Sequence, residues 1–88
     1  MLIPYYSNKF EKDIKKAQKR GKNIEKLKNI IEMLINEKPL PEANRDHKLT
    51  GDLIGHRECH VEADWLLLYR IEDQTIIFVR TGTHSNLF

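Results

Sequence analysis

The sequence predicts a small α+β domain in which a pair of helices covers one face of an antiparallel sheet. Two apolar runs, Trp65–Ile71 and Ile76–Val79, flank a short polar segment, which is typical of a β-hairpin. Apolar residues recur every three or four positions over residues 10–17 and 24–35, which is typical of amphipathic helices. We therefore expect the order β-α-α followed by three or four antiparallel strands, as one domain over residues 1–88.

The N-terminal half of the chain predicts one strand and two helices. Residues 2–6 are apolar and predict a strand, which its internal proline would confine to a sheet edge or a bulge. Either Ser7 or Asn8 is suited to cap the first helix, and Gly21 should end it. The second helix should begin near Asn23. Because the break between the helices is short, we expect them to form an antiparallel pair.

The C-terminal half predicts strands. Residues 42–52 are polar and predict a connection with turns at its glycines. Residues 56–62 alternate in polarity, so we expect a strand with Cys59 and Val61 on one face. The hairpin follows this strand, and residues 84–88 are predicted to form a short tail.

Positive charge is concentrated in the first half of the chain. Residues 1–44 hold ten basic and six acidic side chains (+4), whereas residues 45–88 hold five and seven (−2). Nine of those ten basic residues lie between Lys9 and Lys28. Such a surface attracts a polyanion or an acidic partner, although a solvated helix surface has the same composition.

Composition also predicts where the protein resides. The chain has no apolar run of about 18 residues, so we expect no membrane span. Its first residues lack the pattern of a signal peptide. Cys59 is the only cysteine and cannot form an internal disulfide. We therefore expect a cytoplasmic protein.

Metal binding and thiol chemistry are both disfavoured by the predicted strand. His56 and His60 would lie about 13 Å apart on a strand, too far to share one metal ion. Cys59 would point away from its neighbours Glu58 and His60, so no base would activate the thiol. We therefore expect no metal and no cofactor.

Five polar residues around the hairpin are suited to metal-free cleavage of RNA: His47, His60, Asp64, Arg80 and His84. RNA supplies its own nucleophile, the 2′-hydroxyl, so the protein needs a general base, a general acid and a cation near the phosphate. Histidine is suited to both proton-transfer roles, and arginine is suited to the phosphate.

Each of these residues also has a purely structural interpretation. The histidines and Asp64 can be ordinary surface residues, and Arg80 can pair with Glu62 or Asp64 across the sheet. Trp65 is expected in the core, whereas Phe88 could stack on an unpaired base. Composition and spacing alone therefore indicate only a small α+β domain whose surface is compatible with RNA binding.

Three ordered motifs add a family resemblance. The segments Asp46–Gly51 (DHKLTG), Arg57–Tyr69 (RECHVEADWLLLY) and Arg80–Phe88 (RTGTHSNLF) resemble the YafQ toxins of the RelE superfamily. Together with the predicted order of elements, the resemblance covers the whole chain. It implies a RelE-like β-α-α-β-β-β fold and the toxin of a type II toxin–antitoxin system.

The resemblance implies a metal-independent endoribonuclease that cuts mRNA in the ribosomal A site. His47, His60, Asp64 and His84 match the acid–base residues of the family, and Arg80 matches its phosphate-stabilising arginine. The implied RNA-binding residues are Phe88 and Trp65. Lys12, Lys15, Lys16 and Lys19 match no motif of the family, but their charge is suited to contacts with the phosphates of ribosomal RNA. The implied partners are the 70S ribosome with its mRNA and a cognate acidic antitoxin, through which the toxin would reach operator DNA.

Two other functions are alternatives to cleavage. A non-catalytic module that binds the ribosome or an antitoxin could inhibit translation without cutting mRNA. A DNA-binding regulator is disfavoured because no helix-turn-helix pattern appears.

Overall fold

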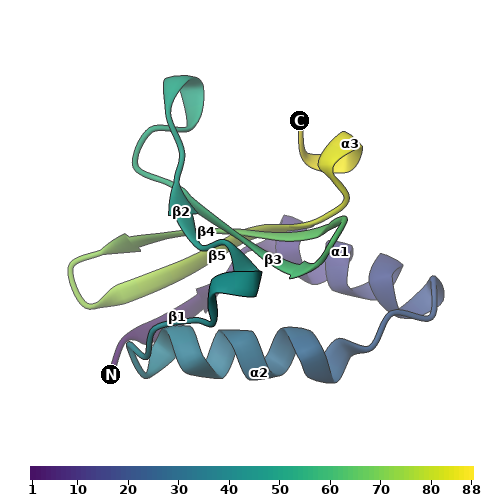
Figure 1. Cartoon of the computed structure of the whole chain (residues 1–88), viewed down its shortest axis with the longest axis horizontal. Coiled ribbons are helices and arrows are strands. Elements are labelled where there is room, and N and C mark those ends of the chain that lie inside the picture. The colour runs from purple at the N-terminus through teal and green to yellow at the C-terminus, as the bar shows by residue number, and fades with distance from the viewer.

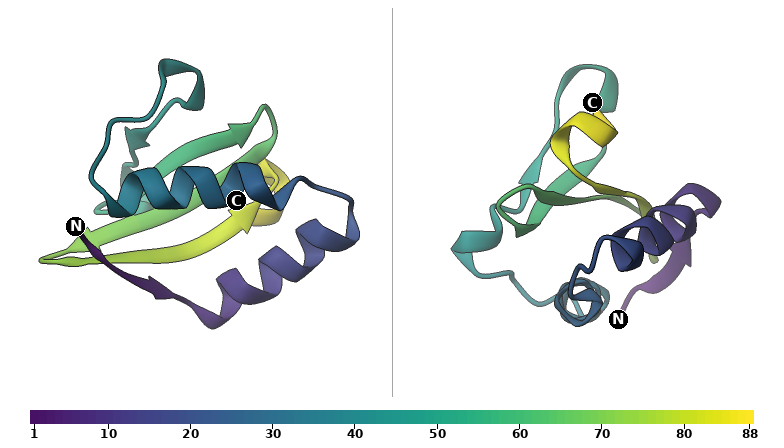
Figure 2. Two further views of the ribbon diagram at one scale, coloured as in Figure 1. Left: turned by 90° about the horizontal axis from the view of Figure 1, so that it is seen from below. Right: turned by 90° about the vertical axis from the view of Figure 1, so that its right-hand side faces the viewer.

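A computed structural model describes residues 1–88 and shows a five-stranded sheet in the order β1-β5-β4-β3-β2 (Figure 1). Both long helices lie on one face of this sheet, as predicted (Figure 2). Strands β2 to β5 are antiparallel neighbours. The elements are β1 (Ile3–Tyr6), α1 (Asn8–Lys19), α2 (Ile24–Ile35), β2 (His47–Lys48), β3 (Arg57–Glu62), β4 (Trp65–Glu72), β5 (Thr75–Gly82) and α3 (His84–Leu87), with short 3₁₀ turns at Glu42–Asn44 and Gly51–Leu53.

Strand β1 corrects the expectation of a wholly antiparallel sheet. It lies at the predicted edge position, but it pairs in parallel with β5, with Tyr5 opposite Ile77. Only a long connection can bring two parallel strands side by side, and here α1, α2 and the other strands separate them. The sheet is therefore mixed.

Both long helices begin at side-chain caps. The Ser7 side chain accepts the backbone N–H of Phe10, and the Asn23 side chain accepts that of Glu25. Gly21, between the helices, has a φ of +76°, a conformation that favours glycine. The two helices run in broadly opposite directions (Figure 2). No helix of the chain combines the length and the apolar character that crossing a membrane requires.

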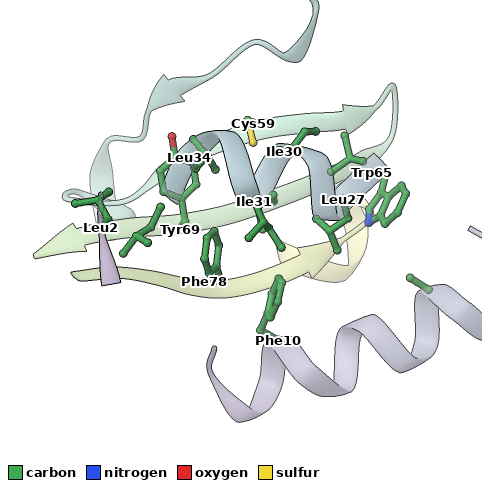
Figure 3. Close-up of a cluster of buried hydrophobic side chains, with 14 residues drawn as sticks. Leu2, Phe10, Leu27, Ile30, Ile31, Leu34, Cys59, Trp65, Tyr69 and Phe78 are labelled. Carbon is green, nitrogen blue, oxygen red and sulfur yellow. The ribbon is translucent and has the colours of Figure 1, made fainter. Parts of the chain in front are cut away.

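The hydrophobic core lies between these helices and the sheet (Figure 3). Phe10, Leu27 and Phe78 are fully buried, and the Phe10 and Phe78 ring centroids are 5.8 Å apart. Cys59 and Val61 face this core, as the alternation in β3 predicts. The first helix, the second helix and the hairpin are therefore held together by one apolar layer.

Two segments of the structure differ from the prediction. Residues 47–48 form the short strand β2 within the expected connection, and residues 84–87 form the helix α3 where a tail was expected. The Thr83 side chain caps α3 by accepting the N–H of Asn86. Helix α3 and the loop after β2 stand on the face that α1 and α2 leave free (Figure 2).

The burial of Cys59 predicts that its thiol reacts slowly in the native protein. Burial raises the pKa of its thiol to about 12, so almost no thiolate exists at pH 8. We expect iodoacetamide to label the native protein at least about 100-fold more slowly than the urea-unfolded protein, as measured by mass spectrometry. Equal labelling rates would show that this thiol is not in the core.

Candidate active site

The predicted catalytic histidines belong to the side of the sheet that α1 and α2 leave free, whereas the Arg80 side chain reaches from β5 to Asp13 on α1. On β3, Cys59 points to the helices, so Glu58 and His60 point the other way. On β5, Thr81 is buried on the helix side, so its neighbour Arg80 starts from the opposite face. The alternation of the strands thus collects polar groups on one surface.

A buried carboxylate lies between two of the histidines. Strand β2 places His47 opposite Glu58. Glu58 Oε1 is 3.5 Å from His47 Nε2 and 4.0 Å from His60 Nε2. The Nδ1 atoms face backbone carbonyls, that of Arg45 at 2.5 Å and that of Ala63 at 3.3 Å. A backbone carbonyl can only accept, so it favours the tautomer protonated at Nδ1, and Nε2 of each ring faces Glu58.

Glu58 was not predicted as a site residue. Its side chain is only 6% exposed, yet it contacts both imidazoles. The sequence did carry a signal, because an acidic residue two positions before His60 on a strand must share its face.

A second network fixes the strand that carries His47. The Tyr69 hydroxyl donates to Asp46 Oδ1 at 2.5 Å, and Arg57 Nε donates to Asp46 at 3.4 Å and to the Tyr69 hydroxyl at 3.3 Å. Burial and the hydrogen bond to Asp46 raise the pKa of Tyr69, so its hydroxyl stays protonated as a donor. Because Asp46 precedes His47, this network holds the two-residue strand β2 against β3.

Asp64 and His84 meet at the other end of the site. Asp64 Oδ1 accepts the backbone N–H of His84 at 3.1 Å, which links the β3–β4 turn to the start of α3. The His84 ring centroid is 5.1 Å from that of Phe88, and Phe88 is 53% exposed. Asp64 therefore positions the backbone of His84, and the rings of His84 and Phe88 lie next to each other at the surface.

Arg80 is held by a carboxylate that the sequence analysis missed. Its Nε and Nη2 donate to the two oxygens of Asp13 at 2.7 and 3.1 Å. The hydrogen bond to Asp13 raises the pKa of Arg80, so the guanidinium is permanently charged. The alternative pairing of Arg80 with Glu62 or Asp64 is not present. Nη1 remains without a protein partner.

The buried position of Asp13 could have been recognised. It lies three residues after Phe10 and four before Ala17, and all three side chains are buried on the same face of α1. A single acidic residue on an apolar helix face needs a partner, and basic residues on the predicted strands were the candidates.

The predicted RNA-binding residues fall into different environments. The lysines of α1, at positions 12, 15, 16 and 19, are exposed and form no ion pair. Of these, Lys16 lines a pocket next to Arg80. Trp65 is 2% exposed, and its Nε1 donates to Thr81 Oγ1 at 3.0 Å. It belongs to the core, and contact of any of these side chains with RNA stays a prediction.

The network around β2 predicts a stability effect. Tyr69→Phe removes the hydroxyl that donates to Asp46, and we expect the free energy of unfolding in urea to fall by about 1–3 kcal/mol. Tyr5→Phe is the matched control, since Tyr5 is 59% exposed on the edge strand and should change the free energy by less than about 0.5 kcal/mol. Equal stability of the two variants would contradict a supporting role for this network.

Comparison with known proteins identifies the family. Residues 3–88 match the family model of YafQ, a bacterial toxin of type II toxin–antitoxin systems. The chain is 49% identical over 84 residues to the mRNA interferase toxin YafQ of Escherichia coli, covering 94% of this chain and 91% of that protein.

Solved structures show the same similarity. The crystal structure of the Escherichia coli DinJ–YafQ complex matches with a TM-score of 0.93 and 46% identity, covering 100% of this chain and 99% of that one. That of a copper-bound mutant toxin from Helicobacter pylori matches with a TM-score of 0.96 and 35% identity over 100% of both chains. The sequence match and the shared fold place this chain in the YafQ family of type II toxin–antitoxin toxins.

Proposed function

We propose that this toxin is an endoribonuclease that cuts mRNA in the ribosomal A site. The observation that carries the proposal is that β2, β3 and the start of α3 bring His47, His60 and His84 to the side of the sheet opposite the long helices, with Arg80 on β5 nearby, bound to Asp13. The name of the Escherichia coli relative, an mRNA interferase, supports the same activity. Cutting mRNA during translation would inhibit growth, which is the effect expected of a toxin.

The proposed reaction is a transfer of the phosphate within the RNA itself. A general base takes the proton of the 2′-hydroxyl, and the 2′-oxygen bonds to phosphorus while the bond to the 5′-oxygen breaks. A general acid protonates the departing 5′-oxygen. The products are a 2′,3′-cyclic phosphate, which water can open to a 3′-phosphate, and a 5′-hydroxyl end.

His47 and His84 are the proposed proton-transfer pair. The His47 side chain is 47% exposed, with Nε2 free of any backbone partner, and the His84 ring is also exposed. Glu58 and the carbonyl of Arg45 orient the His47 ring. His60 and Asp64 assist, the former through the shared Glu58 carboxylate and the latter by holding the backbone of His84.

Arg80 is the proposed stabiliser of the developing negative charge. Asp13 occupies Nε and Nη2, which orients the guanidinium and leaves Nη1 for a phosphate oxygen. A preoriented donor stabilises the transition state because no reorganisation is needed when charge develops. Asp13 is a positioning residue in this scheme and acts through Arg80.

The rest of the surface is proposed to bind macromolecules. Phe88, at 53% exposure beside His84, is placed to stack on a base of the bound codon. The exposed lysines of α1 would dock on ribosomal RNA by contacts to phosphates. The same basic surface would bind a cognate acidic antitoxin, as the DinJ–YafQ complex suggests, and operator DNA only through that complex. With these proposed partners, we expect the toxin to act in the cytoplasm.

Primer extension on an mRNA in a purified translation system tests the proposed cleavage. We expect the wild type to produce new 5′ ends that depend on ribosomes, and His84→Ala to lower their rate by about 10²–10⁴-fold, because a proton-transfer group is lost. His56→Gln is the control, since His56 lies before β3 and outside the site. It should cut like the wild type.

Two outcomes of this experiment would contradict the proposal. Stalled translation with intact mRNA would show that the toxin acts by binding alone, as a non-catalytic module. Because the Helicobacter pylori relative is copper-bound, wild-type toxin dialysed against EDTA is assayed in parallel. Its loss of cleavage, restored by added metal, would overturn a metal-free mechanism.

Arg80→Lys tests the role of the guanidinium. Lysine keeps the charge but cannot bind Asp13 through two nitrogens and a phosphate through a third. We expect the cleavage rate to fall by about 10²–10³-fold. The matched control is Arg70→Lys, because Arg70 pairs with Glu72 near the far end of the hairpin, and it should retain wild-type activity.

A further inference from the structure

We infer that a cationic pocket beside Arg80 binds a second phosphate of the mRNA backbone, adjacent to the phosphate that is cut. The pocket lies between α1, the end of β5 and α3, and its basic residues are Lys16, Arg20, Lys22 and Arg80. Its volume of about 100 Å³ is several times the roughly 10–15 Å³ that one water needs. This inference rests on the proposed function, because it extends the path of the same RNA strand.

The charges of the pocket favour an anion. Four basic residues and two acidic ones, Asp13 and Asp64, line it, so the sum is +2. Arg80 already occupies the Asp13 carboxylate, and Asp64 accepts the backbone N–H of His84. The positive charges on the other side of the pocket are therefore not neutralised by its own carboxylates.

The basic residues opposite Arg80 are only weakly engaged. Lys16 forms no ion pair, and the one side-chain partner of Arg20 is the neutral Asn86 amide oxygen, 3.5 Å from Nη1. Lys22 contacts Glu62 at 3.3 Å, but Lys26 shares that carboxylate at 2.9 Å. A phosphate could therefore gain two or three cationic partners without breaking a strong ion pair.

The position of the pocket favours an mRNA phosphate over a ribosomal RNA phosphate. Arg80 and Asp64 line both the pocket and the proposed catalytic surface, and Trp65 and Ala17 provide its apolar lining. An RNA strand that lies across Arg80 carries its next phosphate one nucleotide away. Binding that phosphate would hold the scissile linkage in line for attack, which is a positioning effect of the kind that raises catalytic rates.

An NMR titration tests the pocket without requiring cleavage. The probe is a 2′-O-methyl trinucleotide, which carries two phosphodiesters and no free 2′-hydroxyl. We expect the amides of Lys16, Lys22 and Gly82 to shift at saturation at low millimolar concentration. Arg20→Ala should raise the dissociation constant about tenfold. It should also lower the slope of log affinity against log salt concentration by about one, because one cationic contact is lost. Lys9→Ala, on α1 but outside the pocket, should bind like the wild type.

Three outcomes would overturn the inference. They are shifts confined to the histidines, binding by Arg20→Ala equal to that of the wild type, and no shift at the pocket amides at 10 mM probe. To distinguish the source of the phosphate, co-sedimentation with mRNA-free ribosomes is measured as well. Unchanged sedimentation of Arg20→Ala supports the mRNA, whereas reduced sedimentation would place ribosomal RNA in the pocket.

Failure of the proposed nuclease activity would look different. If the wild type binds the trinucleotide through Arg20 but leaves mRNA intact during translation, the cleavage mechanism is refuted and the phosphate pocket stands. If Arg20→Ala cuts mRNA and binds the probe as well as the wild type does, the cleavage mechanism stands and the phosphate pocket is refuted.

Discussion

The carboxylate of Asp13 connects the fold of this protein to its site. Strand β1 pairs with β5 only as far as Phe78, so the edge of β5 beyond that residue lacks a neighbouring strand. Asp13 accepts the backbone N–H of Thr81 there at 3.2 Å, and it also holds Arg80. A buried carboxylate is tolerated because each oxygen has donors. Helix α1 is thereby docked on the part of the sheet that carries the arginine.

The same network reaches the tryptophan. Thr81 Oγ1 accepts the N–H of the Trp65 indole and donates to the carbonyl of Leu66. Every buried polar group in this chain of contacts therefore has a partner, which makes the packing between α1, β4 and β5 specific as well as apolar. The motif tryptophan has a structural explanation in this arrangement.

The site itself is assembled from two halves with separate supports. In one half, Tyr69, Arg57 and Asp46 hold the strand of His47 beside Glu58. In the other half, the Asp64 carboxylate accepts the backbone N–H of His84 at the start of α3. Supports of this kind keep functional side chains in place before a substrate binds. Several residues of the three motifs thus support the structure around the candidate site.

By itself, the sequence determined the α+β class, the two capped helices, the hairpin and the strand face that carries His60, because these depend on local periodicity and capping. Tertiary structure alone decided the parallel pairing of β1, the short strand β2 and the partner of Arg80. The pairing of β1 with β5 and that of Asp13 with Arg80 join residues far apart in the chain, and β2 is a two-residue strand defined only by its pairing with β3. Local propensity contains no information about such pairs, and only packing of the whole chain brings them together.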